Sequence, residues 1–215
     1  MSVVDPFRAA RLVLLLRQAG VRDNRVMSAI EKTPRAVFVP PEYRDMAYDN
    51  LKVPIACGQE LSLPVVVGQM LQALNVQPDH DVLEVGTGVG YQAAILSLLA
   101  KRVYTVERFR TLHEKAAETL LSLELDNIRL FHGDGMEGLQ ERAPFDRIIL
   151  TGAISRPPYT LAQQLKSEGI LVAPVEKDGS QQINVYKRVG NQVEKLTTLG
   201  ASKFLPLIIG TAREL

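Results

Sequence analysis

The sequence predicts an α/β protein built on a doubly wound, mostly parallel sheet. From residue 81 onward, short apolar segments of strand length alternate with segments whose apolar residues recur at helical spacing. Such alternation is typical of a parallel sheet covered by helices on both faces. The first strand, 81–85, leads into a glycine-rich turn at 86–90, and a helix follows at once. This order is typical of a nucleotide-type pocket, in which helix N–H groups point at the ligand.

Seven strands are expected in this part of the chain. The first five are 81–85, 102–106, 127–132, 145–150 and 169–175. A helix is expected after each of the first two strands, and a short helix near 159–165. Residues 182–189 and 193–198 are two more strand-like runs, and they are joined through Gly190-Asn191, which is a hairpin signal. The sheet should therefore finish with an antiparallel pair. A last apolar run, 204–209, should return to the core.

An α-helical extension precedes the sheet. Residues 7–19 have one apolar face, and Asp23 can cap a second helix that must end before Pro34. The proline-punctuated, aromatic stretch 35–48 is typical of a lid or arm that packs on the following domain.

A third helix should begin just after Ser62, which is well placed as its N-cap, and run over 64–74. We divide the chain into a helical N-terminal extension, 1–78, with an active loop at 54–64, and a Rossmann-like, pocket-bearing domain, 79–215. The two should form one compact unit.

Composition narrows the class of protein. Lys and Arg total 25 against 24 Asp and Glu, so no basic excess favours nucleic acid or a membrane surface as a partner. Cys57 is the single cysteine, which fits a reducing compartment. The apolar run 12–16 is too short to span a membrane. We expect a soluble cytoplasmic protein.

The glycine turn favours S-adenosylmethionine over NAD. The dinucleotide fingerprint would place its third glycine at position 91, where this chain has Tyr91. An acidic residue, Glu84, also lies inside the strand before the turn. Glycine turns also occur for purely structural reasons, so the pattern alone is weak evidence.

Two acidic residues follow the next strands, at the edge where ligands bind in such sheets. Glu107 lies 17 residues after Gly90 and can accept two hydrogen bonds from ribose hydroxyls. Asp134 can accept from an adenine amino group, and Gly135 lets the ring approach. Separately, Glu107 could be a loop charge paired with Arg108, and Asp134 a turn residue. The glycine turn, Glu107 and Asp134 follow three consecutive strands, and this combination favours a cofactor site.

The sequence contains no metal-site spacing, nucleophile elbow, P-loop or Cys-His pairing. We therefore expect neither a metal ion nor a strong general base. Methyl transfer to a carboxylate needs no base, because a carboxylate is already ionised at neutral pH. Catalysis would then consist mainly of alignment and exclusion of water.

The chain resembles the protein-L-isoaspartate (D-aspartate) O-methyltransferases. The resemblance covers almost the whole chain in the family's order and spacing. Its motifs are Pro34-Arg35-x-x-Phe38-Val39-Pro40, Ala47-Tyr48, Pro54-Ile55, Gly58-Gln59-x-x-Ser62-x-Pro64, Val82-Leu83-Glu84-x-Gly86-Thr87-Gly88-x-Gly90-Tyr91-Gln92-Ala93-Ala94, Val103-Tyr104-Thr105-Val106-Glu107-Arg108, Gly133-Asp134-Gly135, Ala143-Pro144-Phe145-Asp146, Gln164-Leu165 and Phe204-x-Pro206-Leu207.

The resemblance implies a class I S-adenosylmethionine-dependent methyltransferase fold and methyl transfer to the free carboxylate of L-isoaspartyl residues in proteins or peptides. The other product is S-adenosylhomocysteine. The methyl ester would close to a succinimide, whose hydrolysis returns some normal aspartate, so the activity is protein repair. We expect a monomer, and an oligomer is left open.

The resemblance also assigns residues. Ser62 corresponds to the family's active-site serine. The expected cofactor-binding residues are Glu84, Gly86, Thr87, Gly88, Gly90, Glu107, Arg108, Asp134 and Gly135. The loop that would close over cofactor and substrate comprises Gly58, Gln59, Glu60, Leu61, Leu63 and Pro64 around the serine.

The departures of this chain from the family pattern cluster in that loop, with others at position 89 and over 151–158. Glu60 replaces a hydroxyl residue and Leu63 a polar one, while Val89 stands where serine is usual. A carboxylate beside an anionic substrate would repel it, although Arg156 could compensate. Our hypothesis is that Ser62 still orients the acceptor while Glu60 faces solvent.

Two alternatives remain. One is a paralogue that keeps the cofactor site but methylates another acceptor or only binds ligand. The other, an NAD-dependent oxidoreductase, is disfavoured by the absence of glycine at position 91.

Overall fold

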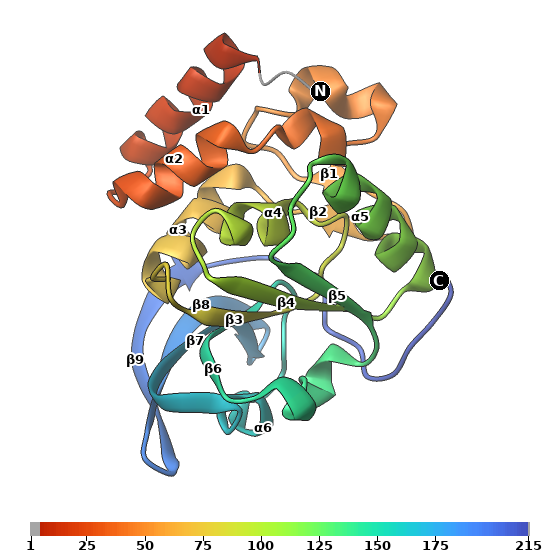
Figure 1. Ribbon diagram of the computed structural model, residues 1–215. Helices are drawn as coiled ribbons and strands as arrows, with labels where there is room; N and C mark the ends of the chain where they lie inside the picture. The colour runs from red at the N-terminus through yellow and green to blue at the C-terminus, as the bar shows by residue number, and fades with distance from the viewer. Residues whose placement is uncertain (1–4, 215) are drawn as a thin grey trace.

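The computed structural model describes residues 5–214 and is organised around a seven-stranded sheet with strand order β5-β4-β3-β6-β7-β8-β9 (Figure 1). The strands are β3 (Asp81–Val85), β4 (Arg102–Glu107), β5 (Ile128–His132), β6 (Phe145–Leu150), β7 (Leu165–Lys177), β8 (Ser180–Val189) and β9 (Gln192–Ala201). The first five in spatial order are parallel, whereas β8 is antiparallel to both β7 and β9. The predicted fold class is confirmed, including the antiparallel ending.

The helices are unevenly distributed over the two faces. They are α1 (Pro6–Gln18), α2 (Asn24–Lys32), α3 (Pro64–Leu74), α4 (Tyr91–Ser97), α5 (Arg110–Ser122) and α6 (Tyr159–Ala162), with 3-10 turns η1 (Arg35–Phe38), η2 (Pro41–Met46), η3 (Gly135–Glu137) and η4 (Gln140–Arg142). Figure 1 shows α3, α4 and α5 on one face with α1 and α2 beyond them, and α6 on the other. The second face is thus covered mainly by one short helix and 3-10 turns.

One continuous hydrophobic core joins the N-terminal helices to the sheet. Leu16 of α1 and Ile30 of α2 are fully buried in the same cluster as Val82 and Ile149 of the sheet. Gly68 of α3 permits this approach, because a Cβ atom there would lie only 2.9 Å from Leu16 Cδ2. No helix within residues 5–214 is long and apolar enough to cross a membrane.

The capping prediction is confirmed for α2 and is wrong for α3. Asp23 caps α2 as predicted, and its side chain accepts hydrogen bonds from two backbone N–H groups of the first turn. Ser62, however, does not cap α3: the N-cap position is Leu63, and Pro64 opens the helix. Asn50 instead accepts from the first-turn N–H of Val65 at 3.2 Å. The Ser62 side chain is therefore not engaged in starting the helix.

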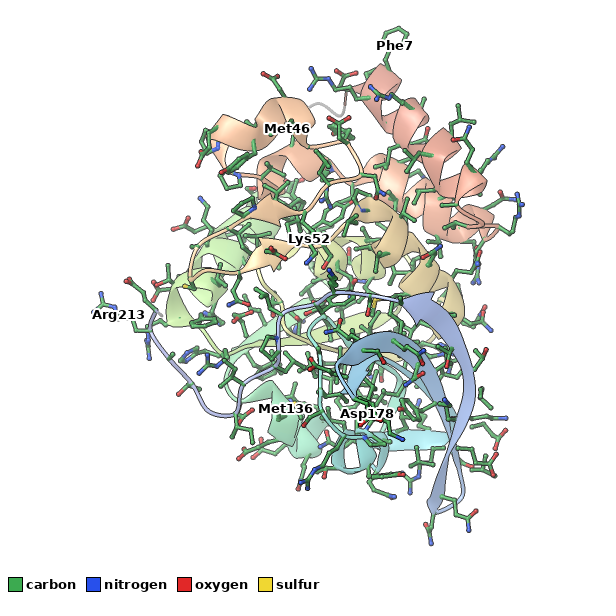
Figure 2. The ribbon with its side chains drawn as sticks, turned by 180° about the vertical axis from the view of Figure 1, so that it is seen from behind. Phe7, Met46, Lys52, Met136, Asp178 and Arg213 are labelled. Carbon is green, nitrogen blue, oxygen red and sulfur yellow. The ribbon has the colours of Figure 1, made fainter. Side chains whose placement is uncertain are left out.

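The prediction that 204–209 returns to the core is confirmed only in part, because Phe204 and Leu207 are partly buried against the hydrophobic clusters but the end of the run is not. Ile208 and Ile209 are 51% and 77% exposed. The segment instead crosses the carboxyl ends of the strands, where Ala153 exchanges two backbone hydrogen bonds with Leu205 and Leu207, each 2.8 Å. Figure 2 shows this C-terminal segment running between Lys52 and Met136 towards Arg213.

Candidate active site

A single cavity lies at the carboxyl ends of the central strands. Four parts of the chain contribute most of it: the glycine turn with the ends of β3, β4 and β6, residues 134–136 after β5, the loop before α3 with the start of that helix, and the C-terminal segment. Its wall comprises Lys52, Ile55, Gln59, Glu60, Leu61, Ser62, Leu63, Val66, Val67, Val85, Gly86, Thr87, Gly88, Val89, Tyr91, Gln92, Val106, Glu107, Arg108, Phe109, Leu112, Asp134, Gly135, Met136, Thr151, Gly152 and 202–208.

The glycine turn needs glycine for two different reasons. Gly86 has φ +93°, and a Cβ there would lie 2.3 Å from Thr151 Oγ1, so the residue is required by packing. Gly88 has φ +56°, and the nearest atom to an added Cβ is Ile55 Cδ1 at 3.7 Å, so the left-handed backbone conformation rather than crowding favours glycine here. No side chain covers the turn at Gly88, and its contact with the cofactor stays a prediction.

Glu107 is fixed at the edge of this turn. Its carboxylate accepts from Gly88 N at 2.8 Å and from Phe109 N at 2.9 Å. Burial raises the pKa of Glu107, and these backbone hydrogen bonds oppose the rise. A carboxylate has about four lone-pair sites, so two remain for ligand hydroxyls. The geometry fits the predicted ribose-binding role.

Asp134 lies on the cavity wall but also holds the C-terminal segment. Its two oxygens accept from Met136 N at 2.9 Å and from Gly210 N at 2.6 Å. Gly135 has a packing reason besides the predicted one, since a Cβ there would lie 2.5 Å from Val85 Cγ1. Arg108 lines the cavity as well, and its Nε donates to the Gly210 carbonyl at 3.0 Å.

Two predicted cofactor residues lie behind the wall rather than on it. Glu84 is fully buried beneath the turn, accepts from Thr105 Oγ1 at 2.6 Å, and has its pKa raised to about 8, chiefly by burial. Thr105 in turn shares a 2.7 Å hydrogen bond with Thr87. Gly90 packs on Leu120, whose side chain would lie 3.2 Å from an added Cβ. Neither residue is on the cavity wall, and both support the turn from behind, so their contact with the cofactor stays a prediction.

The active loop is a small hairpin of β1 (Val53–Pro54) and β2 (Glu60–Leu61), paired antiparallel. Its residues 59–63 line the cavity, whereas Gly58 and Pro64 do not. Gly58 has φ +59°, which suits its place in the tight turn between the strands. The loop therefore presents Ser62 to the same cavity that Glu107 enters.

The charge of Glu60 is compensated, although not by the predicted residue. Lys52 Nζ lies 2.5 Å from Glu60 Oε2, and both side chains are about one third exposed at the cavity wall. Arg156 is exposed outside the cavity and makes no ion pair with any residue of the described range 5–214. We expected the Glu60 side chain to face solvent; it is partly exposed, but it also borders the cavity.

Sequence reasoning missed Lys52 and the C-terminal wall, 202–208. No sequence pattern singles out Lys52, because its proximity to Glu60 depends on the register of a hairpin whose strands have only two residues each. The C-terminal residues were expected in the core because they are apolar. The clue that they are not is the intervening Pro206, which interrupts any regular element.

Comparisons with known proteins agree with this geometry. The family model described as Protein-L-isoaspartate(D-aspartate) O-methyltransferase matches residues 8–212. Proteins named Protein-L-isoaspartate O-methyltransferase from Maricaulis maris (strain MCS10) and Paracoccus denitrificans (strain Pd 1222) are each 47% identical. The first alignment covers 100% of both chains, and the second covers 94% of each.

Solved structures show the same fold. A structure titled protein-L-isoaspartate O-methyltransferase superposes with a TM-score of 0.82 at 24% identity, covering 94% of this chain and 67% of that one. A putative protein-L-isoaspartate O-methyltransferase from Plasmodium falciparum, in complex with S-adenosyl-L-homocysteine, gives 0.81 at 22% identity, covering 92% and 97%. By its family match and its full-length relatives, this chain belongs to the protein-L-isoaspartate (D-aspartate) O-methyltransferase family.

Proposed function

We propose that this protein transfers a methyl group from S-adenosylmethionine to the free carboxylate of L-isoaspartyl residues in damaged proteins and peptides, with Ser62 orienting the acceptor. The observation that carries the assignment of sites is the shared cavity. The buried carboxylate of Glu107 and the serine of the active loop border one space, although 44 residues lie between Ser62 and Glu107 in the chain. Cofactor and acceptor can therefore be held side by side.

The residues present fit an adenosyl cofactor. The open backbone at Gly88 allows close approach, Glu107 keeps lone pairs for ribose hydroxyls, and Asp134 lies at the next strand end. When bound, the cofactor supplies an electrophilic methyl group on a sulfonium. The turn is held in place by the Thr151 hydroxyl, which donates to the Gly86 carbonyl, and by the Val106 carbonyl, which accepts from the backbone N–H groups of Gly86 and Thr87.

The acceptor half of the cavity works by positioning. An acceptor carboxylate is already ionised at neutral pH, so no base has to remove a proton. The Ser62 hydroxyl can donate a hydrogen bond to one acceptor oxygen and leave the other free to react. Leu61, Leu63 and Leu207 supply apolar surface that excludes water from this space.

The Lys52–Glu60 pair removes an electrostatic objection to an isoaspartyl acceptor. A lone Glu60 carboxylate would repel an anionic acceptor, but its pairing with Lys52 leaves that part of the wall without net charge. The departure of this loop from the family pattern is therefore compatible with the family's substrate.

The deciding experiment measures methyl transfer from labelled S-adenosylmethionine to an isoaspartyl peptide, with the matching aspartyl peptide as control. We expect base-labile labelling of the isoaspartyl peptide only. S-adenosylhomocysteine should also raise the melting temperature, since it binds the native state. Cofactor binding without transfer to either peptide would refute the repair assignment and favour the paralogue.

A further inference from the structure

A buried arginine lies directly behind the active serine. Arg35, in η1, is 0% exposed, and its Nη2 donates to the carbonyl oxygen of Ser62 at 2.9 Å. Its guanidinium also stacks over the ring of Tyr91, with 4.6 Å between Cζ and the ring centroid. Tyr91 and Ser62 both line the cavity. Arg35 therefore links the N-terminal extension to the acceptor loop and to the first residue of α4.

This positive charge has no counter-ion. Across residues 5–214 no carboxylate pairs with Arg35, and its Nε and Nη1 atoms lack hydrogen-bond partners, as does the Tyr91 hydroxyl. An arginine side chain stays protonated in proteins, so the group is a buried cation. Burying an unpaired charge is costly, and packing alone would be served better by an apolar side chain of similar volume.

Packing does not require the charge at this position. Phe38 already joins η1 to Tyr91 through an edge-on ring contact, with centroids 5.5 Å apart. What the guanidinium adds is a hydrogen bond to the Ser62 carbonyl and a positive field close to the loop. In a poorly solvated site such a field is weakly screened. An anionic acceptor bound beside Ser62 would be its natural counter-charge.

We propose that Arg35 is a positioning residue for the acceptor: it fixes the backbone of Ser62 and supplies the positive potential that draws the acceptor carboxylate to the serine. The inference rests on the proposed function. It assigns acceptor recognition partly to the N-terminal extension, outside both the loop and the Rossmann-like domain.

The test compares Arg35→Met and Arg35→Lys with a matched control, Arg147→Met. Arg147 also donates to a backbone carbonyl, that of Leu74 at 2.7 Å, but it lies away from the cavity wall. For each variant we would measure KM for the isoaspartyl peptide, kcat, the Kd of S-adenosylhomocysteine and the melting temperature. All assays are run well below the lowest melting temperature of the set.

Arg35→Met should raise the peptide KM by about tenfold or more, as loss of a charged hydrogen bond implies. Arg35→Lys, which keeps the charge, should stay within about threefold of wild type, and the Kd of S-adenosylhomocysteine should change by less than about threefold in either variant. Arg147→Met should lower the melting temperature without changing the peptide KM.

A peptide KM for Arg35→Met equal to that of wild type would overturn the inference, and so would an Arg35→Lys variant as impaired as Arg35→Met. Either result, obtained with an active wild-type enzyme, leaves the proposed function intact. If wild type methylates no isoaspartyl peptide, the proposed function fails first, and this inference fails with it.

Discussion

The ammonium group of Lys52 lies 2.5 Å from the carboxylate of Glu60, across the small hairpin that carries Ser62 into the cavity. Both side chains border the cavity, so the pair replaces two opposite charges by one neutral patch. A partly exposed pair of this kind contributes little to folding stability. Its importance lies in the electrostatic potential that an incoming acceptor meets.

Removing only the cation of this pair should impair acceptor binding. Lys52→Met leaves Glu60 unpaired, and we expect the KM for an isoaspartyl peptide to rise by about tenfold because like charges repel. The double variant Lys52→Met/Glu60→Gln should regain most of the wild-type KM. Together with the single variant Glu60→Gln, steady-state kinetics on the wild type and these variants form a double-mutant cycle. Additive effects of the two changes would show that Lys52 binds the acceptor by itself rather than neutralising Glu60.

Ser62→Ala should separate chemistry from cofactor binding. The hydroxyl is not used to cap α3, so its loss should leave the melting temperature nearly unchanged. Loss of acceptor alignment should lower kcat/KM by about 10²-fold. Calorimetry with S-adenosylhomocysteine should give an unchanged Kd. Full activity of the alanine variant would remove Ser62 from the mechanism.

Glu107→Gln should weaken cofactor binding. The change keeps the shape of the side chain but removes the charge that accepts from Gly88 N and Phe109 N. We expect the Kd of S-adenosylhomocysteine to rise by about tenfold or more, since hydrogen bonds to a charged group are strong. Glu137, an exposed acid on the neighbouring turn η3, provides the control substitution Glu137→Gln, which should bind normally. Equal affinity of wild type and Glu107→Gln would contradict the ribose-binding role.

Glu84 should make stability fall as the pH rises. Its pKa is raised from 4.5 to about 8 in the folded protein, so between these values the native state binds the proton more tightly than the unfolded state. The stabilising contribution of the protonated group is complete below pH 4.5 and is lost as the pH approaches 8. Relative to wild type, Glu84→Gln should gain on the order of 3 kcal/mol between pH 5 and pH 8.

Urea unfolding of both proteins at several pH values measures this difference. The two free energies of unfolding should be closest at pH 5 and diverge as the pH increases. A constant difference across the range would mean that Glu84 is ionised in the folded protein throughout.

Features encoded by local sequence were predictable. Asp23 caps α2 because its side chain needs only the next few N–H groups, and Glu107 borders the cavity because it is the last residue of the parallel strand β4. The hairpin at Gly190-Asn191 likewise depends on adjacent residues. In each case the partners lie within one turn or one strand.

The errors involve partners that are distant in the sequence. Ser62 looks like a cap until Asn50, 12 residues earlier, is seen to bind the first turn of α3. The sequence also does not show that the carboxylate of Glu84 is buried and accepts a hydrogen bond from the hydroxyl of Thr105 in the neighbouring strand. Lys52 acquires a role only when the hairpin register brings it to Glu60. Such pairings depend on tertiary structure that no periodicity encodes.

The hydrogen bond from Gly210 N to Asp134 has a consequence for the order in which the cavity can be completed. One wall of the cavity consists of residues 202–208, which are held in place partly by this bond. These residues follow β9 in the sequence, so this wall can dock only after the edge of the sheet that precedes it has formed. A folding chain should therefore have its glycine turn and its serine loop in place before this flank of the cavity closes.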